Sequence, residues 1–138
     1  MIRLATGADL PRIIEIRDNA GEDPLSDPTA VTAGDAERLI DNGALWVWHE
    51  ADGLVTGFSG GDKRDGSIRA LFVAPGHEGK GIGRALLAKA CDVLRNAGHR
   101  EAWLTTSPGT RAERHYRAAG WTPSGYSAKG ELIFRKPL

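Results

Sequence analysis

The sequence lacks several features that would assign it to a specialised class of protein. Cys91 is the one cysteine in 138 residues, so an intrachain disulfide cannot form, and this fits a reducing compartment. No run approaches the roughly 18 apolar residues of a membrane span. The first residues also lack the basic-then-apolar pattern of a signal peptide. We therefore expect a cytoplasmic protein with no membrane partner.

An excess of charge and a metal-ligand pattern are also missing. The 18 basic residues balance the 18 acidic residues, so no charge footprint for a nucleic-acid partner appears. His49, His77, His99 and His115 show no HxxxH spacing, and a paired CxxC is absent. We expect neither a nucleic-acid partner nor a metal site.

What remains is the composition of an ordinary globular domain. Hydrophobic residues make up 41% and charged residues 26% of the chain, and no repeat or linker divides it. Periodicity, caps and turn residues predict strands at 2–5, 44–49, 54–59, 68–73, 102–106, near 121 and at 132–135, and helices at 6–19, 32–42, 81–97 and 110–119. Segments 21–28 and 60–66 are predicted to be loops. The predicted order, β-α-α-β-β-β-α-β-α-β-β, is a mixed sheet with helices on its faces.

The most informative segment is Gly79-Lys80-Gly81-Ile82-Gly83-Arg84, between an apolar strand and an amphipathic helix. Three alternate glycines allow successive backbone N–H groups to point into one concavity. The N-terminus of the following helix adds its dipole, and Lys80 and Arg84 add formal positive charge. This glycine turn is therefore predicted to bind a phosphate group.

Two nucleotide motifs do not fit the glycine turn. A Walker A loop needs Ser or Thr after its Gly-Lys pair, but Gly81 follows Lys80. A dinucleotide fingerprint needs glycine at its sixth position, which is Arg84 counted from Gly79 and Leu86 counted from Gly81. The remaining alternative to a phosphate site is a turn that binds no ligand. That alternative does not explain why Lys80 and Arg84 stand at the start of the helix.

Two segments together resemble the GNAT acetyltransferase superfamily. Residues 78–84 resemble its acetyl-CoA signature, Q/R-x-x-G-x-G/A, after a strand that ends in a V-x-P-like turn. Residues 110–121 resemble the later segment A-x-x-F-Y-x-x-x-G-F, with the expected strand between them. The resemblance covers essentially the whole chain. It implies a single GNAT-like domain over residues 1–138, a three-layer α/β fold whose mixed, mostly antiparallel sheet of six or seven strands is flanked by about four helices.

The resemblance also implies an activity. It points to an N-acetyltransferase that uses acetyl-CoA as cosubstrate and a primary amine, on a small molecule or a protein, as acceptor. The amine would attack directly and form a tetrahedral intermediate. The alternative is a non-catalytic, acyl-CoA-binding regulatory module of the same fold. Homodimers are common in this family, but the sequence does not identify the acceptor or the oligomeric state.

The resemblance carries roles onto individual residues. The backbone N–H groups of the glycine turn would bind the pyrophosphate, and the backbone of Leu71, Phe72 and Val73 would pair with the pantetheine arm. The Val73 N–H would stabilise the oxyanion, and Tyr116 would protonate the departing thiolate. A tyrosine that only packs in the core is the alternative for Tyr116. The implied cofactor-binding set is Leu71, Phe72, Val73, Gly79, Lys80, Gly81, Ile82, Gly83 and Arg84.

Two positions depart from the family pattern, and one role has no clear candidate. Glu78 places a negative side chain where Gln or Arg is expected, and Gly109 stands where the family often has Asn. The side chains available as a general base are His49, Glu50, Asp62 and His77. Deprotonation through water is an equal alternative.

Overall fold

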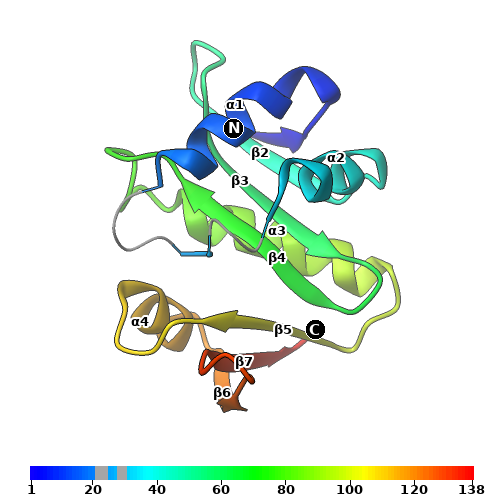
Figure 1. Ribbon diagram of the computed structural model, residues 1–138. Helices are drawn as coiled ribbons and strands as arrows, with labels where there is room; N and C mark the ends of the chain where they lie inside the picture. The colour runs from blue at the N-terminus through cyan, green and yellow to red at the C-terminus, as the bar shows by residue number, and fades with distance from the viewer. Residues whose placement is uncertain (21–24, 28–30) are drawn as a thin grey trace.

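A computed structural model describes residues 1–20, 25–27 and 31–138 of the chain. Over these residues it forms one seven-stranded sheet in the spatial order β1-β2-β3-β4-β5-β7-β6, with helices on both faces (Figure 1). The pair β4–β5 is parallel and the other neighbouring pairs are antiparallel. The predicted fold class and element order are confirmed.

The boundaries of the elements lie within a few residues of those predicted. The strands are β1 Ile2–Leu4, β2 Leu45–His49, β3 Val55–Asp62, β4 Ser67–Val73, β5 Glu101–Thr106, β6 Thr122–Tyr126 and β7 Leu132–Pro137. The helices are α1 Leu10–Asp18 after a short 3-10 turn at Gly7–Asp9, α2 Ala33–Asp41, α3 Ile82–Asn96 and α4 Arg111–Ala118. Of the predicted loop 21–28, residues 21–24 and 28 lie outside the described residues.

The predicted turn at 60–66 is wrong in its first half, because β3 continues through Gly60 and Gly61 to Asp62. These glycines are needed for close packing against helices. A Cβ on Gly60 would come within 2.8 Å of the Leu39 side chain, and one on Gly61 within 2.8 Å of the Ala90 carbonyl oxygen. The sequence alone cannot separate this use of glycine from a turn, since both favour a residue without a side chain.

Two apolar layers hold the helices on the sheet. On one face, α1 and α2 pack through residues such as Ile13 and Leu39 against Phe58 and Phe72. On the other face, α3 and α4 pack with Leu71, Leu104 and Phe134, which come from three strands of the sheet. Every residue of β3 is buried, since this central strand is covered on both faces.

The strands β4 and β5 separate soon after they begin. Their one paired position is Ser67 with Trp103, and in Figure 1 the two arrows diverge toward their C-terminal ends. Arg69 is an extra residue in β4, because Gly60 pairs with Ala70 whereas Gly61 pairs with Ile68. Such a bulge bends a strand and increases its twist. The fold therefore leaves a gap between two parallel strands in the middle of the sheet.

Candidate active site

Among the residues that the structure describes, the edge of β4 that faces the gap has no strand partner after Ser67. The Ala74 N–H donates to the Thr56 carbonyl at 2.8 Å, on the side of β3. Because successive N–H groups of a strand point to opposite edges, the Val73 N–H points away from β3, toward the side of β5. The Leu71 N–H, two residues earlier, shares this direction. The strand thus offers an open, strand-like edge at the positions predicted for the pantetheine arm.

The glycine turn follows directly and borders a cavity. Gly79 and Gly81 have φ values of 79° and 81°, in the left-handed region that favours glycine, and no heavy atom lies within 4 Å of a Cβ built on either. The cavity has a volume of about 250 Å³, and Val73, Arg84, Arg111 and His115 line it together with the glycine turn. The turn, the helix N-terminus and two arginines therefore surround one space.

The predicted cofactor-binding residues divide into two groups. Val73, Gly79, Gly81, Ile82, Gly83 and Arg84 line the cavity. The Lys80 ammonium instead lies 3.2 Å from His77 Nδ1 and 4.0 Å from a Glu50 carboxylate oxygen. The Phe72 ring stacks on Phe58 in the core under α1 and α2, at a centroid distance of 5.1 Å. For Phe72, only the backbone is available to the gap.

The two departures from the family pattern have local partners. The Glu78 carboxylate accepts a hydrogen bond from the Gly76 N–H at 2.9 Å, so it folds back on its own turn. Gly109 has a φ of 78°, and its N–H donates to the Glu113 carboxylate at 3.0 Å. Glu113 also donates its own N–H to the Thr110 hydroxyl, which caps α4. Each residue thus stabilises the turn in which it lies.

Tyr116 lies on α4 with its side chain in the core. It is 2% exposed, and its hydroxyl donates to the Leu25 carbonyl oxygen at 3.0 Å. Burial raises the pKa of the phenol well above its usual value. The Leu25 side chain packs close to Gly83 and lines the same cavity as Val73. Tyr116 therefore lies next to the gap, and its hydroxyl is already hydrogen-bonded to a backbone oxygen.

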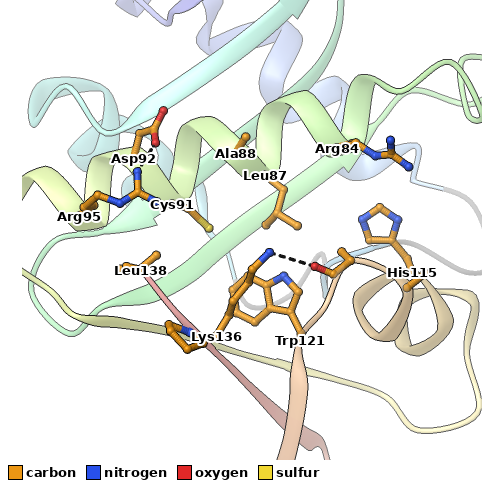
Figure 2. A pocket seen from close by; sticks show the side chains of 13 residues that line it. Arg84, Leu87, Ala88, Cys91, Asp92, Arg95, His115, Trp121, Lys136 and Leu138 are labelled. Carbon is orange, nitrogen blue, oxygen red and sulfur yellow. Dashed lines mark hydrogen bonds and ion pairs between the residues drawn. The ribbon is translucent and has the colours of Figure 1, made fainter.

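A second cavity of about 430 Å³ continues on the other side of Arg84 and His115, which line both spaces. Figure 2 shows the His115 ring of α4 directly below the Arg84 side chain of α3. Leu87, Cys91 and Trp121 form much of the wall, and the Lys136 ammonium donates to the Ala119 carbonyl at 2.9 Å. Sequence reasoning did not select His115 or this cavity. The one available signal was that His115 stands at the phenylalanine position of the family segment.

A third, smaller cavity lies where β4 and β5 begin to separate. It has a volume of about 80 Å³ and is lined by Asp27, Ser67, Arg69, Trp103 and Thr105, among others. Three segments that are distant in sequence meet here: residues 26–27, the start of β4 and the middle of β5. The cavity is small and partly polar, and it lies at the narrow end of the gap.

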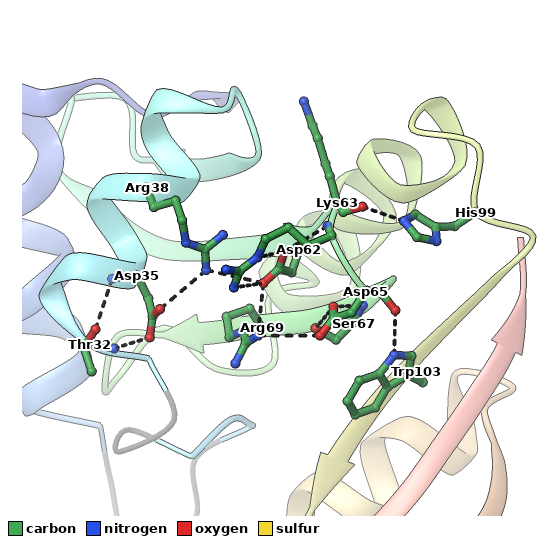
Figure 3. Close-up of polar contacts among 11 residues, drawn as sticks. Thr32, Asp35, Arg38, Asp62, Lys63, Asp65, Ser67, Arg69, His99 and Trp103 are labelled. Carbon is green, nitrogen blue, oxygen red and sulfur yellow. Dashed lines mark hydrogen bonds and ion pairs between the residues drawn. The ribbon is translucent and has the colours of Figure 1, made fainter.

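The side chain of Asp62 lies in an ion-pair cluster at the β3–β4 turn (Figure 3). Its carboxylate is fully buried and within 3.3 Å of guanidinium nitrogens of Arg38, Arg64 and Arg69. Hydrogen bonds from Arg64 lower the pKa of Asp62 far below its usual value. Burial opposes this shift, and Arg69 and Arg38 add to it. A carboxylate held so firmly in its charged form is a weak proton acceptor, so Asp62 does not suit the role of general base.

Two further findings concern the described ranges 1–20, 25–27 and 31–138 only. There, no group of three or more His, Cys, Asp or Glu side chains is arranged to hold a metal ion. No helix of these ranges has the length and apolarity needed to cross a bilayer.

Comparison with known proteins agrees with this geometry. Residues 10–121 match the sequence model of the Acetyltransferase (GNAT) family. The chain belongs to this family. It is 32% identical over 152 aligned positions to an aminoglycoside N(6')-acetyltransferase type 1 from Stenotrophomonas maltophilia, covering 99% of this chain and 93% of that protein.

The similarity to other proteins differs in how much of each chain it covers. The chain is 34% identical over 100 residues to a mycothiol acetyltransferase from Beutenbergia cavernae, covering 69% of this chain and 34% of that protein. It is also 42% identical over 60 residues to a streptothricin acetyltransferase from Streptomyces lavendulae, covering 43% of this chain and 32% of that protein. The chain thus spans only about a third of the length of these two curated relatives. A putative acetyltransferase from Salmonella typhimurium, solved with acetyl-CoA, shares the fold with a TM-score of 0.79, 23% identity, and coverage of 100% of this chain and 93% of that one.

Proposed function

We propose that this GNAT protein transfers the acetyl group of acetyl-CoA to a primary amine. The observation that carries the proposal is the open edge of β4 running directly into the glycine turn. A pantetheine arm can pair with Leu71, Phe72 and Val73 as an added strand would, through backbone hydrogen bonds. The pyrophosphate then reaches the backbone N–H groups of residues 79–84, at the N-terminus of α3, where anions are stabilised.

The size and chemistry of the site fit this elongated anionic cosubstrate. The cavities of about 250 Å³ and 430 Å³ meet at Arg84 and His115, so they can accept neighbouring parts of one ligand. The positions that would face the pyrophosphate, Gly79 and Gly81, leave open space where side chains would stand. Arg84 and Arg111 supply positive charge at the wall.

The reaction follows from the placement of Val73. The neutral amine attacks the thioester carbonyl carbon, a C–N bond forms, and the carbonyl oxygen becomes an oxyanion that the Val73 N–H stabilises. The tetrahedral intermediate then collapses, the C–S bond breaks, and the amine nitrogen loses a proton to water or a nearby base. A bound ammonium ion must first lose its extra proton, since a lysine-like amine has a pKa of about 10.4.

Tyr116 is proposed to donate its proton toward the departing sulfur. Its hydroxyl has to leave the Leu25 carbonyl to do so, which exchanges one hydrogen bond for another. A thiol has a pKa of about 8.5, and the phenol pKa is above its usual value of about 10, so complete transfer is uphill. Donation of a strong hydrogen bond as charge develops on sulfur is therefore the favoured form of this role.

The proposed acceptor is a small-molecule or protein amine that enters at the narrow end of the gap. The cavity of about 80 Å³ there is lined by Asp27, Ser67 and Trp103, among others. The S. maltophilia relative, which matches nearly the whole chain, is named for acetylation of an aminoglycoside amine. This supports a small-molecule amine as the first acceptor class to test.

The experiment is an acceptor screen that monitors free coenzyme A. The protein is incubated with acetyl-CoA and a panel of amines, including aminoglycosides, amino acids and a lysine-bearing peptide. We expect thiol release that depends on one class of amine, with acetylated product found by mass spectrometry. Acetyl-CoA binding without amine-dependent release across the panel would instead support the non-catalytic binding module.

A further inference from the structure

His115 lines the proposed coenzyme site and has a buried ring nitrogen. Its side chain lies against the glycine turn, with Cε1 at 3.8 Å from a Cβ built on Gly83. The ring also contacts the Tyr116 ring edge-on, at a centroid distance of 5.2 Å. Among the residues that the structure describes, the buried Nε2 of His115 has no hydrogen-bond partner. A buried polar atom without a partner is costly, so this one calls for a ligand.

Two arginines lie near the His115 ring. Burial is the largest cause that lowers the pKa of His115. The positive charges of Arg111 on α4 and Arg84 on α3 lower it further. Of the carboxylates that line the two cavities, Glu78 is bound to the Gly76 N–H and Asp92 to Arg95. Other titratable groups of the cavity walls are His77, which pairs with Glu50, the Cys91 thiol and the Lys136 ammonium. The buried Tyr116 hydroxyl belongs to the ring that contacts His115 edge-on.

We propose that His115 is a ligand of the coenzyme's phosphate groups and that it takes up a proton when the coenzyme binds. The inference rests on the proposed function, because it assumes that the phosphates occupy the cavity at the glycine turn. His115 lines both cavities, so its Nε2–H can donate to a phosphate oxygen on either side of Arg84. The family segment has phenylalanine at this position, which could not make this bond.

The direction of the pH effect follows from the charges. In the free protein, two arginines and burial disfavour the imidazolium. A bound pyrophosphate brings two negative charges beside the ring, which offsets the arginines and raises the pKa of His115 in the complex. Binding therefore takes up protons between the free and the bound pKa, and affinity increases as the pH falls through this range. Each unit of difference between the two pKa values changes the dissociation constant about tenfold.

The test is calorimetric titration with 3′-dephospho-coenzyme A. This ligand keeps the pyrophosphate but lacks the 3′-phosphate monoester, which itself titrates near pH 6. Titrations at about pH 5.5, 6.5 and 8 bracket the histidine range, and two buffers with different heats of ionisation report the proton uptake. For the natural sequence we expect uptake of a fraction of a proton near pH 6.5. We also expect binding roughly tenfold tighter at the acid end than at the alkaline end.

The variants separate His115 from the other histidines. His115→Phe and His115→Gln should both lose the proton uptake. His115→Gln, which keeps a hydrogen-bond donor, should bind at all pH values about as the natural sequence does at the alkaline end, and His115→Phe should bind more weakly than that. His99→Asn is the matched control, because His99 bonds the Lys63 carbonyl far from the cavities, and it should keep the linkage. His77→Asn removes the other histidine of the cavity wall and should also keep it.

Four results would overturn the inference or its basis. Equal proton uptake in His115→Phe and the natural sequence, or binding that does not change with pH, would show that His115 does not take up the proton. Loss of the linkage in His77→Asn alone would move the role to His77. Failure of the natural sequence to bind either coenzyme A or its dephospho form at any pH would instead contradict the proposed function.

Discussion

At the scale of single residues, backbone groups carry most of the proposed chemistry and side chains adjust it. Val73 contributes an N–H whose direction is fixed by the pairing of β4 with β3. Lys80, the most conspicuous cation in the glycine turn, is directed toward His77 and Glu50. Arg84 and Arg111 are the cations at the cavity wall. Substitution of single side chains should therefore separate turnover from binding.

Tyr116→Phe tests the proposed proton donor. We expect turnover to fall by about 10²-fold to 10⁴-fold, the usual contribution of general acid catalysis, while acetyl-CoA affinity stays within a few fold. Loss of the hydrogen bond to Leu25 should cost about 1 kcal/mol of stability. The measurements are steady-state kinetics and urea unfolding. Tyr126→Phe is the control, since Tyr126 is 67% exposed and should change neither. Unchanged turnover in Tyr116→Phe would leave the tyrosine a packing residue.

At the scale of elements, the site depends on a bulged strand, a glycine turn and a helix N-terminus in succession. The turn and helix were predictable from sequence, because alternate glycines before an amphipathic stripe have a local cause. The gap was not, because the divergence of β4 from β5 depends on pairing between distant segments and on the bulge at Arg69. The cavity-lining role of His115 likewise depends on how α4 packs beside α3.

Gly81→Ala tests the glycine turn. The left-handed backbone at Gly81 should cost an alanine about 1–2 kcal/mol. Gly98→Ala is the matched control, because Gly98 has a φ of 96° and nothing within 4 Å of a built Cβ, but it lies at the other end of α3. Both variants should lose similar stability in urea unfolding, and only Gly81→Ala should also weaken acetyl-CoA binding. Equal affinities in the two variants would show that the turn does not hold the coenzyme.

Asp62→Asn tests the ion-pair cluster that holds the β3–β4 turn. Removing the buried carboxylate leaves three arginines without their shared partner. We expect a loss of about 3 kcal/mol, at the low end for a broken buried pair, because Arg64 is largely exposed. Asp92→Asn removes an exposed partner of Arg95 and should cost less than about 1 kcal/mol. Urea unfolding measures the stability lost in each variant. Equal losses in Asp62→Asn and Asp92→Asn would contradict a stabilising role for the buried Asp62 carboxylate.

At the scale of the whole molecule, the pKa shifts predict how stability changes with pH. His115, Asp9 and Asp62 have pKa values lowered in the folded state, so each contributes stability above its unfolded pKa and loses it as the pH falls. Their unfolded pKa values are about 6.5 for His and 3.9 for Asp. The pKa of Tyr116 is raised, so its contribution is present below about pH 10 and lost above it.

Urea unfolding as a function of pH measures this profile. We expect a maximum between about pH 7 and 9, a first decline below about 6.5, a steeper one below about 4, and a decline above about 10. His115→Phe should remove the first acid decline and leave the second. A urea midpoint of unfolding that rises as the pH falls from 7 to 5 would contradict the lowered pKa of His115 in the folded protein.

The most direct test of the central claim is binding of acetyl-CoA at the glycine turn. Parallel calorimetric titrations with acetyl-CoA and with ATP compare the proposed cosubstrate with the nucleotide that a phosphate-binding turn could otherwise hold. We predict saturable one-to-one binding of acetyl-CoA, weakened in Gly81→Ala, and much weaker binding of ATP. Tight ATP binding without acetyl-CoA binding would contradict the account.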